Sequence, residues 1–297
     1  MSNSFSSSSR PNLACEITAD RVLAGRTSQP GGPVECATAS LRPGSLVPDL
    51  TEPNLKDRDN VAQGIRDALG RFGGTRGRDV IALLPDAAAR VVFLDFETLP
   101  TKREEAEAVV RFRLKKSLPF DVEKAKVSYH SHPAQGSVRV IAAVALSSVI
   151  EEYESAFVEA GYNPGVVMPS MLGALGAARA ARPALVLKVD ARTISIAILD
   201  QQQILLFRTL ENTNGVDITG DRLAEEVYPS VVFFQDTYNL NIDQIFVAGL
   251  PNLEEAAAAL RAQTGAQVQE LAGSSQLGGG RDSIPKWQVA GIVGALA

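Results

Sequence analysis

The stretch FLDFETLPTKREEAEAVVRFRLKKSLPFDVEKAKVSYHSH, residues 93–132, carries the strongest indication of the fold. It joins a β-type run, a Leu-Pro stop, a charged helical segment, a Leu-Pro-Phe stop and an extended run. Thr101 and Glu104 have the spacing of a capping box, which predicts that the helix begins there. Pro119 disfavours the α conformation of the residue before it, so the helix is predicted to end near Leu118. Periodicity alone indicates a strand–helix–strand unit of a kind common in α/β proteins.

Outside this stretch, the order strand–strand–strand–helix–strand–helix occurs twice, once from residue 12 and once from residue 184. Three antiparallel strands followed by crossover helices form a mixed sheet of the ribonuclease-H type. Two such units predict an α/β, actin-like (ribonuclease-H-like duplicated) two-lobed fold; the alternative is two unrelated α/β domains. The predicted divisions are a disordered tail at 1–11, a first lobe at 12–182 and a second lobe at 183–297.

The order of elements in residues 93–132 resembles the inserted subdomain of the PilM family, actin-like cytoplasmic proteins of type IV pilus assembly. In that family the stretch runs as a strand, Leu-Pro, an acidic helix, Ile-Pro-Phe and a strand with a tyrosine. The resemblance implies a small inserted α+β subdomain at about 97–140. The corresponding positions here are Leu99-Pro100, Glu104-Glu105, Leu118-Pro119-Phe120 and Val127-Ser128-Tyr129.

Composition bounds the classes of function. The 297 residues are 45% hydrophobic and 21% charged, an ordinary globular composition that suits about two domains. A net charge of −5 disfavours a nucleic-acid surface. Two cysteines, Cys15 and Cys36, are too few for a disulfide scaffold or a zinc cluster; they are interpreted as buried thiols, although neighbouring positions on paired strands stay open. No apolar run of about 18–20 residues occurs, so the chain is predicted to be cytoplasmic.

The resemblance also implies a phosphate clamp at the first hairpin of each half and a glycine element that holds adenosine. The matching residues are Glu16 and Thr18 in the first hairpin, Asp190 and Thr193 in the second, and Gly249 near the end. An acidic group in such a hairpin organises Mg²⁺ through water, and glycine allows backbone N–H groups to approach phosphate.

The glycines of the two clamps are missing. Ile17, Thr18, Ala191 and Arg192 stand where glycine-bearing turns are expected, and a bulky residue at a position with positive φ costs on the order of 1 kcal/mol. No phosphate loop of the GxxxxGK[ST] type and no hydrolase constellation is visible. The chain is therefore predicted to be a degenerate ATPase without catalytic or metal residues, with ATP and magnesium as the alternative cofactors.

Two functions from different classes follow. The first is a cytoplasmic scaffold of type IV pilus or related secretion assembly, recruited to the inner face of the inner membrane. Its partners would be the cytoplasmic tail of a PilN-like inner-membrane protein and other pilus platform proteins, with membrane association only through partners and no nucleic acid. The second is an active ATPase or sugar-kinase relative, for which Asp190 is the only well-placed catalytic candidate.

The tail of such a partner is an extended peptide that could bind beside an exposed strand of the inserted subdomain by β-addition. The competing interpretation is that the aromatic side chains of this subdomain fill its own core. The candidate contacts are Phe112, Leu118, Phe120 and Tyr129, with Arg111 and Arg113 at the rim.

Overall fold

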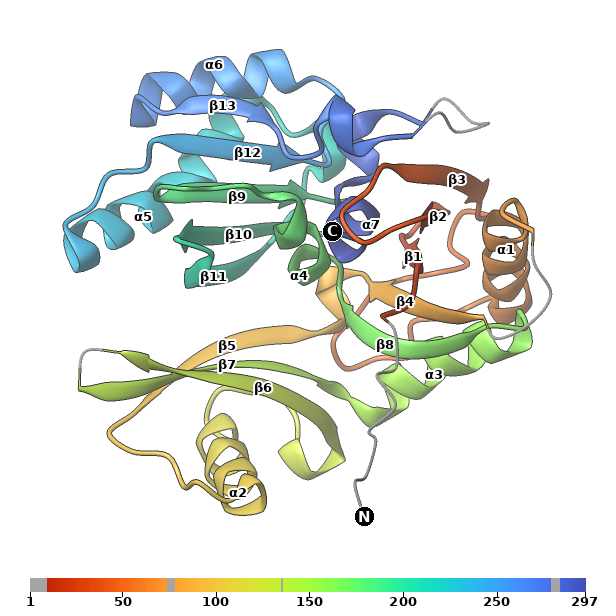
Figure 1. Ribbon diagram of the computed structural model, residues 1–297, viewed down its shortest axis with the longest axis horizontal. Coiled ribbons are helices and arrows are strands. Elements are labelled where there is room, and N and C mark those ends of the chain that lie inside the picture. Colours follow the sequence, from red (N-terminus) through yellow and green to blue (C-terminus); the bar gives the residue numbers. More distant parts are fainter. Residues whose placement is uncertain (1–9, 74–77, 135, 279–283) are drawn as a thin grey trace.

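The computed structural model describes residues 10–73, 78–134, 136–278 and 284–297, which form two five-stranded sheets, one three-stranded sheet and their helices (Figure 1). Most of the predicted tail, residues 1–9, lies outside the described residues. Arg10 is described, and its guanidinium donates hydrogen bonds to the carbonyl oxygens of Ala295 at 2.8 Å and Ala297 at 3.1 Å. The described start of the chain is therefore bound to its C-terminal end.

The first large sheet has the order β3-β2-β1-β4-β8. Its first three strands are antiparallel neighbours, whereas β4 and β8 are parallel to β1. Alternating buried side chains on these strands contribute to two separate hydrophobic clusters, one on each face of the sheet. The bounds are β1(Leu13–Ile17), β2(Arg21–Thr27), β3(Val34–Ser40), β4(Asp79–Leu84) and β8(Asn163–Pro169).

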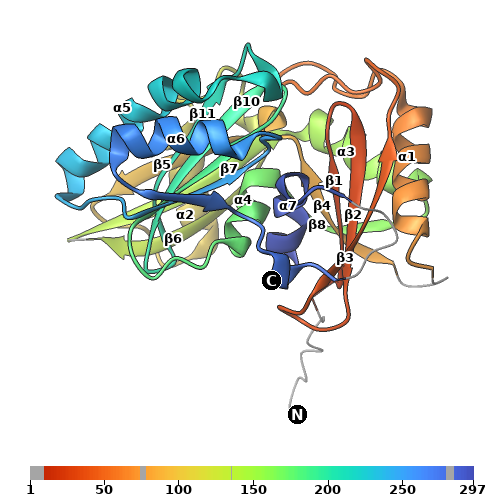
Figure 2. The ribbon, with the colours of Figure 1, turned by 90° about the horizontal axis from the view of Figure 1, so that it is seen from above.

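Two amphipathic helices, α1(Arg58–Gly70) and α3(Ser147–Glu159), cover the outer face of this sheet (Figure 2). Ile65 of α1 and Tyr153 and Phe157 of α3 are fully buried in the cluster between these helices and the sheet. The Asp57 carboxylate begins α1 by accepting a hydrogen bond from the Asn60 backbone N–H.

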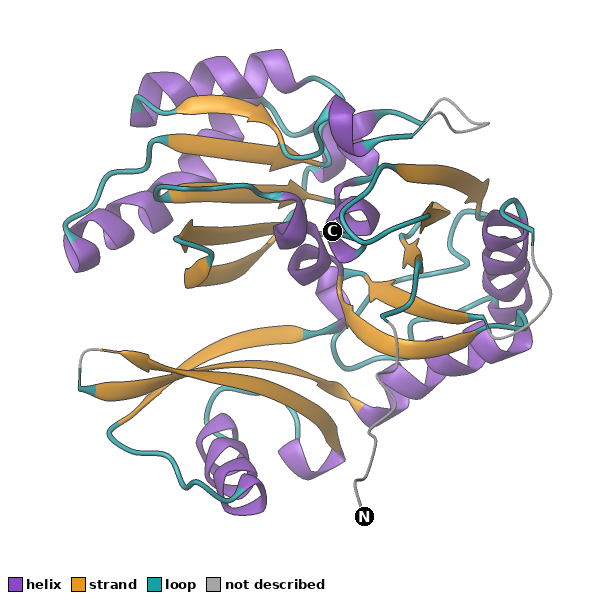
Figure 3. Ribbon diagram, in the orientation of Figure 1, coloured by secondary structure: helices purple, strands orange, loops and turns teal. Residues whose placement is uncertain are grey.

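The second large sheet repeats this topology with the order β11-β10-β9-β12-β13. Again three antiparallel strands are followed by two parallel ones, with helices α5 and α6 on the outer face (Figure 3). This repeat confirms the predicted duplicated, two-lobed α/β fold, and the division of the chain at Pro183 stays a prediction. The bounds are β9(Ala184–Val189), β10(Thr193–Asp200), β11(Gln203–Glu211), β12(Gln244–Ala248), β13(Gln267–Glu270), α5(Gly220–Tyr238) and α6(Leu253–Thr264).

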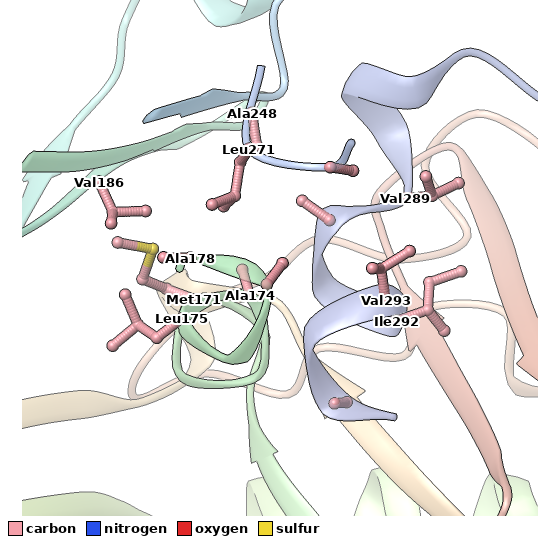
Figure 4. Packing of buried hydrophobic residues seen from close by; sticks show 14 of the residues in the cluster. Met171, Ala174, Leu175, Ala178, Val186, Ala248, Leu271, Val289, Ile292 and Val293 are labelled. Carbon is pink, nitrogen blue, oxygen red and sulfur yellow. The ribbon is translucent and has the colours of Figure 1, made fainter. Parts of the chain in front are cut away.

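Two short helices, α4(Ser170–Ala174) and α7(Ala290–Ala295), lie between the two large sheets and form the middle of a shared core (Figure 4). Each helix is flanked by a 3₁₀ turn, Leu175–Ala177 after α4 and Lys286–Gln288 before α7. A Cβ atom at Gly294 of α7 would clash with the Gly173 carbonyl oxygen of α4. The two helix backbones therefore touch, and both lobes pack on the same pair of helices.

A third unit is inserted between β4 and α3. It is a three-stranded antiparallel sheet of order β5-β7-β6 with one helix on its face (Figure 1). Its core contains Val110 and Leu114 of the helix and Val140 of the central strand. The bounds are β5(Arg90–Phe96), β6(Ala125–Ala134), β7(Ser137–Leu146) and α2(Arg103–Leu114).

The ends of α2 differ from the prediction. The residue before the helix is Lys102, and no side chain caps it, so the predicted capping box of Thr101 does not form. The helix ends at Leu114, four residues before the predicted end. Proline cannot donate the N–H that would continue the ladder, and Leu118 turns inward to pack against the core of the inserted unit.

The contact between α4 and α7 makes the first testable prediction. Gly294→Ala places a methyl group against backbone atoms of α4, including the Ala174 carbonyl oxygen at 2.8 Å, which no rotamer change can relieve. We expect the free energy of unfolding, measured by chemical denaturation, to fall by about 1–3 kcal/mol. The matched control is Gly70→Ala in α1, where nothing lies within 4 Å and helix propensity predicts a small gain of up to about 1 kcal/mol. Equal effects of the two substitutions would contradict the packing argument.

Candidate functional site

A cavity of about 280 Å³ lies between the lobes, where the ends of β1 and β9 face each other. Its walls come from the β1–β2 hairpin, the β9–β10 hairpin, the end of β12 and the segment that leads into α7. Apolar side chains make up most of this wall, and its charged groups come from the two hairpins. Among the lining residues are Glu16, Thr18, Lys188, Asp190, Gly249 and Trp287.

The buried Lys188 lies among three carboxylates at the cavity. Lys188 is the one charged residue of β9, a strand whose six residues are all buried. Its Nζ lies 3.4 Å from Glu16 Oε1, 3.5 Å from Asp86 Oδ2 and 4.0 Å from Asp190 Oδ2. Glu16 and Asp86 belong to the first lobe, whereas Lys188 and Asp190 belong to the second. The ammonium group therefore joins the lobes through ion pairs, and we call these four residues the interlobe ion cluster.

Hydrogen bonds hold the carboxylates of this cluster in place. Asp86 Oδ1 accepts from the Met171 backbone N–H at 2.8 Å, and Asp86 Oδ2 accepts from the Ser195 hydroxyl at 3.1 Å. Glu16 Oε1 accepts from the Ser170 hydroxyl. Glu16 Oε2 is buried and has no hydrogen-bond partner among the residues that the structure describes. Three of the four carboxylate oxygens of Glu16 and Asp86 thus accept a hydrogen bond from α4 or from the second lobe, and the fourth is Glu16 Oε2.

Burial and charge act in opposite directions on these groups. Burial raises the pKa of Asp86 above its usual range, against the attraction of the Lys188 ammonium. Burial alone would lower the pKa of Lys188, but the carboxylates of Asp86, Glu16 and Asp190 outweigh it and raise that pKa. Lys188 is therefore charged at neutral pH, as the counter-ion that makes burial of the carboxylates tolerable.

The second hairpin is closed by its own aspartate. Asp190 Oδ1 accepts from the backbone N–H groups of Arg192 at 2.8 Å and Thr193 at 2.7 Å. The Thr193 hydroxyl donates to Asp190 Oδ2 at 2.9 Å. An aspartate that bonds to the backbone two and three residues ahead supports a turn without glycine. Asp190 is thus engaged in the turn as well as in the ion cluster.

The first hairpin is closed in a comparable way, with Thr18 N–H donating to the Arg21 carbonyl oxygen at 2.9 Å and the Thr18 hydroxyl donating to Asp20 Oδ1 at 2.9 Å. The strain expected from missing glycines is a wrong prediction, since side-chain oxygens allow ordinary backbone conformations at both turns. None of the four positions concerned has a positive φ: Ile17, Thr18, Ala191 and Arg192.

Gly249 has a conformation that requires glycine. Its φ is +85°, and a Cβ atom there would clash with the Val189 carbonyl oxygen of β9. Its N–H donates to the Trp287 carbonyl oxygen at 2.8 Å. Gly249 therefore brings the segment before α7 against the second sheet, and this contact places Trp287 in the cavity wall.

The structure brings four of the five predicted cofactor residues to one cavity, namely Glu16, Thr18, Asp190 and Gly249. Thr193 lines a neighbouring cavity of about 470 Å³. Sequence reasoning missed Lys188, Asp86 and Ser170. Two of these had a signal: Lys188 is a charge inside the apolar strand ALVLKV, and Asp86 follows the buried run 80–84 after a single proline.

A cation of the chain itself already lies among these carboxylates. The Lys188 ammonium is between the carboxylates of both lobes, 3.4 Å from Glu16 Oε1 and 3.5 Å from Asp86 Oδ2. Within the described parts of the chain, no group of three or more His, Cys, Asp or Glu residues is arranged to hold a metal ion. A metal at this position would have to displace the ammonium from its ion pairs.

The predicted partner residues divide into two groups in the inserted unit. Leu118, Phe120 and Tyr129 are partly buried and pack against its core. Arg111 forms an ion pair with Glu107 at 2.9 Å and donates to the carbonyl oxygens of 122 at 3.0 Å and 125 at 3.2 Å. These four side chains therefore make contacts inside the unit.

Phe112 and Arg113 lie on the outer face of α2. Phe112 is 69% exposed, and its neighbour one turn earlier, Val109, is 37% exposed. The Arg113 guanidinium lies 5.8 Å from the centre of the Phe96 ring and donates to the Asp95 carbonyl oxygen at 3.4 Å. We call Val109, Phe112 and Arg113 the α2 outer face.

Across residues 10–73, 78–134, 136–278 and 284–297, the helices are too short or too polar to cross a bilayer. Cys15 and Cys36 are buried and unpaired with each other, and they contribute to hydrophobic clusters on opposite faces of the first sheet. Burial raises the pKa of the Cys36 thiol to about 12.

The repeated sheet, the cleft between its two copies and the inserted unit define a protein of the actin-like fold. The chain is similar to the solved PilM-PilN type IV pilus biogenesis complex, with a TM-score of 0.79, 19% identity, and coverage of 97% of this chain and 98% of that chain. This likeness confirms the predicted resemblance to PilM at the level of the fold. The sequence matches no protein-family model and no curated protein.

A second solved structure has a related shape. It is the cytoplasmic domain of EpsL, an inner membrane component of the type II secretion system of Vibrio cholerae. The TM-score is 0.55 with 10% identity, and the match covers 96% of this chain and 94% of that chain. The fold described here is therefore one that also occurs in a secretion system.

The interlobe ion cluster makes the second prediction. Lys188→Met leaves buried carboxylates without a counter-ion, so we expect the free energy of unfolding at pH 8 to fall by about 3–5 kcal/mol. The raised pKa of Lys188 means that its contribution is fully present below the ordinary lysine pKa of about 10.4 and is lost as pH rises through the folded-state pKa. Denaturation of both proteins at several pH values measures this effect.

The same series tests the carboxylates. Folding raises the pKa of Asp86. Its contribution to the free energy of unfolding is therefore present below the unfolded-state pKa of about 3.9 and is lost as the pH rises through the folded-state pKa. In Lys188→Met, the ammonium that opposes the rise in the Asp86 pKa is missing, so Asp86 takes up a proton at a higher pH and loses its unpaired charge. The difference in the free energy of unfolding between the wild-type protein and the variant should therefore shrink as the pH falls toward 5. The control Arg182→Met breaks an exposed 3.5 Å ion pair with Asp243 and should cost no more than about 0.5 kcal/mol. A deficit that is independent of pH would contradict the assignment.

Proposed function

We propose that this protein is a scaffold of type IV pilus or related secretion assembly that binds the cytoplasmic tail of a PilN-like inner-membrane protein. The observation that carries the proposal is the similarity, over nearly the whole of both chains, to PilM in a complex with PilN. In this proposal the protein acts in the cytoplasm at the inner face of the inner membrane. It reaches the membrane through its partners, which include other pilus platform proteins.

The open edge of the inserted sheet supports a binding mode for such a tail. The order β5-β7-β6 leaves the ten-residue strand β6 at an edge, with β7 on one side only. An edge strand offers unpaired backbone N–H and C=O groups to an added strand. An extended tail could thus add to β6 through its backbone N–H and C=O groups.

The α2 outer face offers side chains to a partner on the side of the inserted unit where Arg113 contacts Asp95 and Phe96 of β5, the strand at the other edge from β6. A phenylalanine that is 69% exposed contributes little to the folded monomer, and exposed aromatic groups are typical anchors of protein interfaces. Arg113 beside it offers hydrogen bonds to a polar or acidic rim. Leu118, Phe120, Tyr129 and Arg111 would shape this site by holding α2 and β6 in place.

The interlobe ion cluster supports the further proposal that the protein is a pseudo-ATPase. A lysine holds the two lobes together where a nucleotide-dependent relative would use a bound cation. The two lobes are then held together by charged side chains of the protein itself, so assembly of the pilus machinery would not depend on ATP binding. This favours the scaffold over the alternative of an active ATPase or kinase-like enzyme.

The third prediction concerns the tail. Phe112→Ala should weaken binding of the PilN-like cytoplasmic tail about tenfold, since truncation of one interface anchor typically costs about 1–2 kcal/mol. Arg113→Glu should also weaken it, and neither should change the melting temperature by much. Binding is measured by calorimetry with a synthetic tail peptide. The matched control is Phe233→Ala, another exposed phenylalanine (58%) on α5, which should leave tail binding unchanged. Unchanged binding in Phe112→Ala would contradict this site.

The fourth prediction concerns nucleotide. Titration of the protein with ATP and Mg²⁺ should give weak or undetectable heat, because Lys188 occupies the space between the carboxylates. Asp190→Ala is a poor probe alone, since it removes three hydrogen bonds from the β9–β10 turn and should lower stability. A 1:1 isotherm with low-micromolar affinity for ATP would support the active ATPase instead.

A further inference from the structure

Most of the large apolar side chains that remain in solvent gather on two helices. Among the residues that the structure describes, seven such side chains are exposed, and five of them belong to α2 or to α5 and the turn after it. On the second helix these are Tyr228, Phe233 and Leu240. Successive side chains of a helix are about 100° apart, so Tyr228, Phe233 and the exposed Asp236 lie on one side of α5. We call Tyr228, Phe233, Asp236 and Leu240 the α5 outer face.

The surroundings of the exposed phenylalanine on α2 are positively charged. Arg113 follows Phe112 directly, and Lys116 comes four residues after it, in the turn that ends the helix. Both cations are exposed, and neither forms an ion pair with another described residue. Lys115, by contrast, is paired with Glu123 at 3.1 Å. The α2 outer face therefore presents an aromatic ring beside two cations that are available to a partner.

The surroundings of the exposed phenylalanine on α5 have the opposite charge. Asp236 comes three residues after Phe233, is exposed and forms no ion pair with another described residue. The one cation of this helix, Arg222, is already paired with Glu225 and Glu226. The α5 outer face therefore presents an aromatic ring beside an available carboxylate, which complements the α2 outer face in charge.

The two outer faces cannot meet within one chain, because the inserted sheet lies between their helices. Adjacent residues of its central strand β7 point to opposite sides of the sheet. Val140 belongs to the same core as Val110 of α2, whereas Arg139 Nη1 donates to the Tyr238 hydroxyl of α5 at 2.6 Å. Figure 1 shows α2 below this sheet and the second lobe above it. A contact between the two outer faces therefore requires two copies of the chain.

We propose that copies of this chain associate head to tail, with the α2 outer face of one copy against the α5 outer face of the next. Phe112 and Phe233 then leave water together, and Arg113 and Lys116 face Asp236. Because the two surfaces differ, every copy keeps one free surface of each kind, so the assembly grows into a ring or a filament. The proposal does not rest on tail binding, although the tail and a second copy would compete for Phe112.

Analytical ultracentrifugation of the full chain tests the association. The contact is small, so we expect a dissociation constant of about 10–100 µM. The weight-average mass should rise above that of the monomer as the protein concentration is raised from about 5 to 500 µM. The rise should be smaller at about 500 mM salt than at about 50 mM salt, because salt screens exposed charges. A monomer mass over the whole range overturns the proposal.

A charge exchange tests which surfaces meet. Asp236→Lys and Lys116→Glu each bring like charges together, so each should weaken self-association at least about fivefold at low salt. Both side chains are exposed, so the melting temperatures should stay close to that of the wild-type protein. A mixture of the two variants should associate again, because each new charge meets its opposite on the other protein. Failure of the mixture to associate overturns this pairing of surfaces.

Three truncations separate this proposal from tail binding. Phe233→Ala should weaken self-association and leave tail binding in dilute solution unchanged, whereas Phe112→Ala should weaken both. The control Val158→Ala removes an equally exposed apolar side chain (64%) of α3, outside both faces, and should leave self-association unchanged. An equal loss in Val158→Ala would indicate unspecific apolar aggregation and overturn the assignment. If tail binding fails but the charge exchange succeeds, the association stands alone.

Discussion

The relation between the two lobes depends on a lysine buried among carboxylates. A lone buried ion would be strongly destabilising, so Glu16 and Asp86 are tolerated as buried carboxylates only while the Lys188 ammonium lies within about 3.5 Å of each of them. Because the lysine comes from β9 and the two carboxylates come from β1 and the end of β4, this condition sets how the lobes approach. Ser170 and Ser195 then orient the carboxylates. The geometry of the cleft follows from satisfying these charges.

The backbone contact of α4 and α7 acts together with this cluster. Gly173 and Gly294 allow two short helices to approach closely, and the apolar residues around them form a core shared by both large sheets (Figure 4). Ser170, which donates to Glu16, is the first residue of α4, and Gly291, which lies against Glu16 Oε2, is in α7. The same two helices therefore contribute to the apolar core and contact the interlobe ion cluster. A substitution that shifts α4 or α7 should also shift the groups that orient Glu16.

The inserted unit is organised by a separate core and is free of the interlobe ion cluster. Its helix packs Val110 and Leu114 inward and leaves Phe112 in solvent. In the proposed function this separation matters, since a partner can bind at α2 and β6 while the cleft keeps one geometry. An actin-like fold then provides the platform on which the inserted unit is presented.

The sequence by itself determined the kind and order of the elements, because the hydrophobic period of each segment is a local property. The repeat of three strands followed by crossover helices, which begins at residue 12 and again at residue 184, led to the duplicated fold. The resemblance to the PilM family, and no local rule, assigned Glu16, Asp190 and Gly249 to one site, and in the structure all three line one cavity. Helix ends were less predictable: α2 stops at Leu114 because Leu118 finds a place in the core, which no local rule describes. Only the tertiary structure decided that Lys188 lies among Glu16, Asp86 and Asp190, since these residues are far apart in the chain and their ion pairs exist only once two lobes meet. It also decided that the glycine-free hairpins are unstrained, that Phe112 is exposed and that Phe120 is partly buried, because burial depends on what the rest of the chain packs against each side chain.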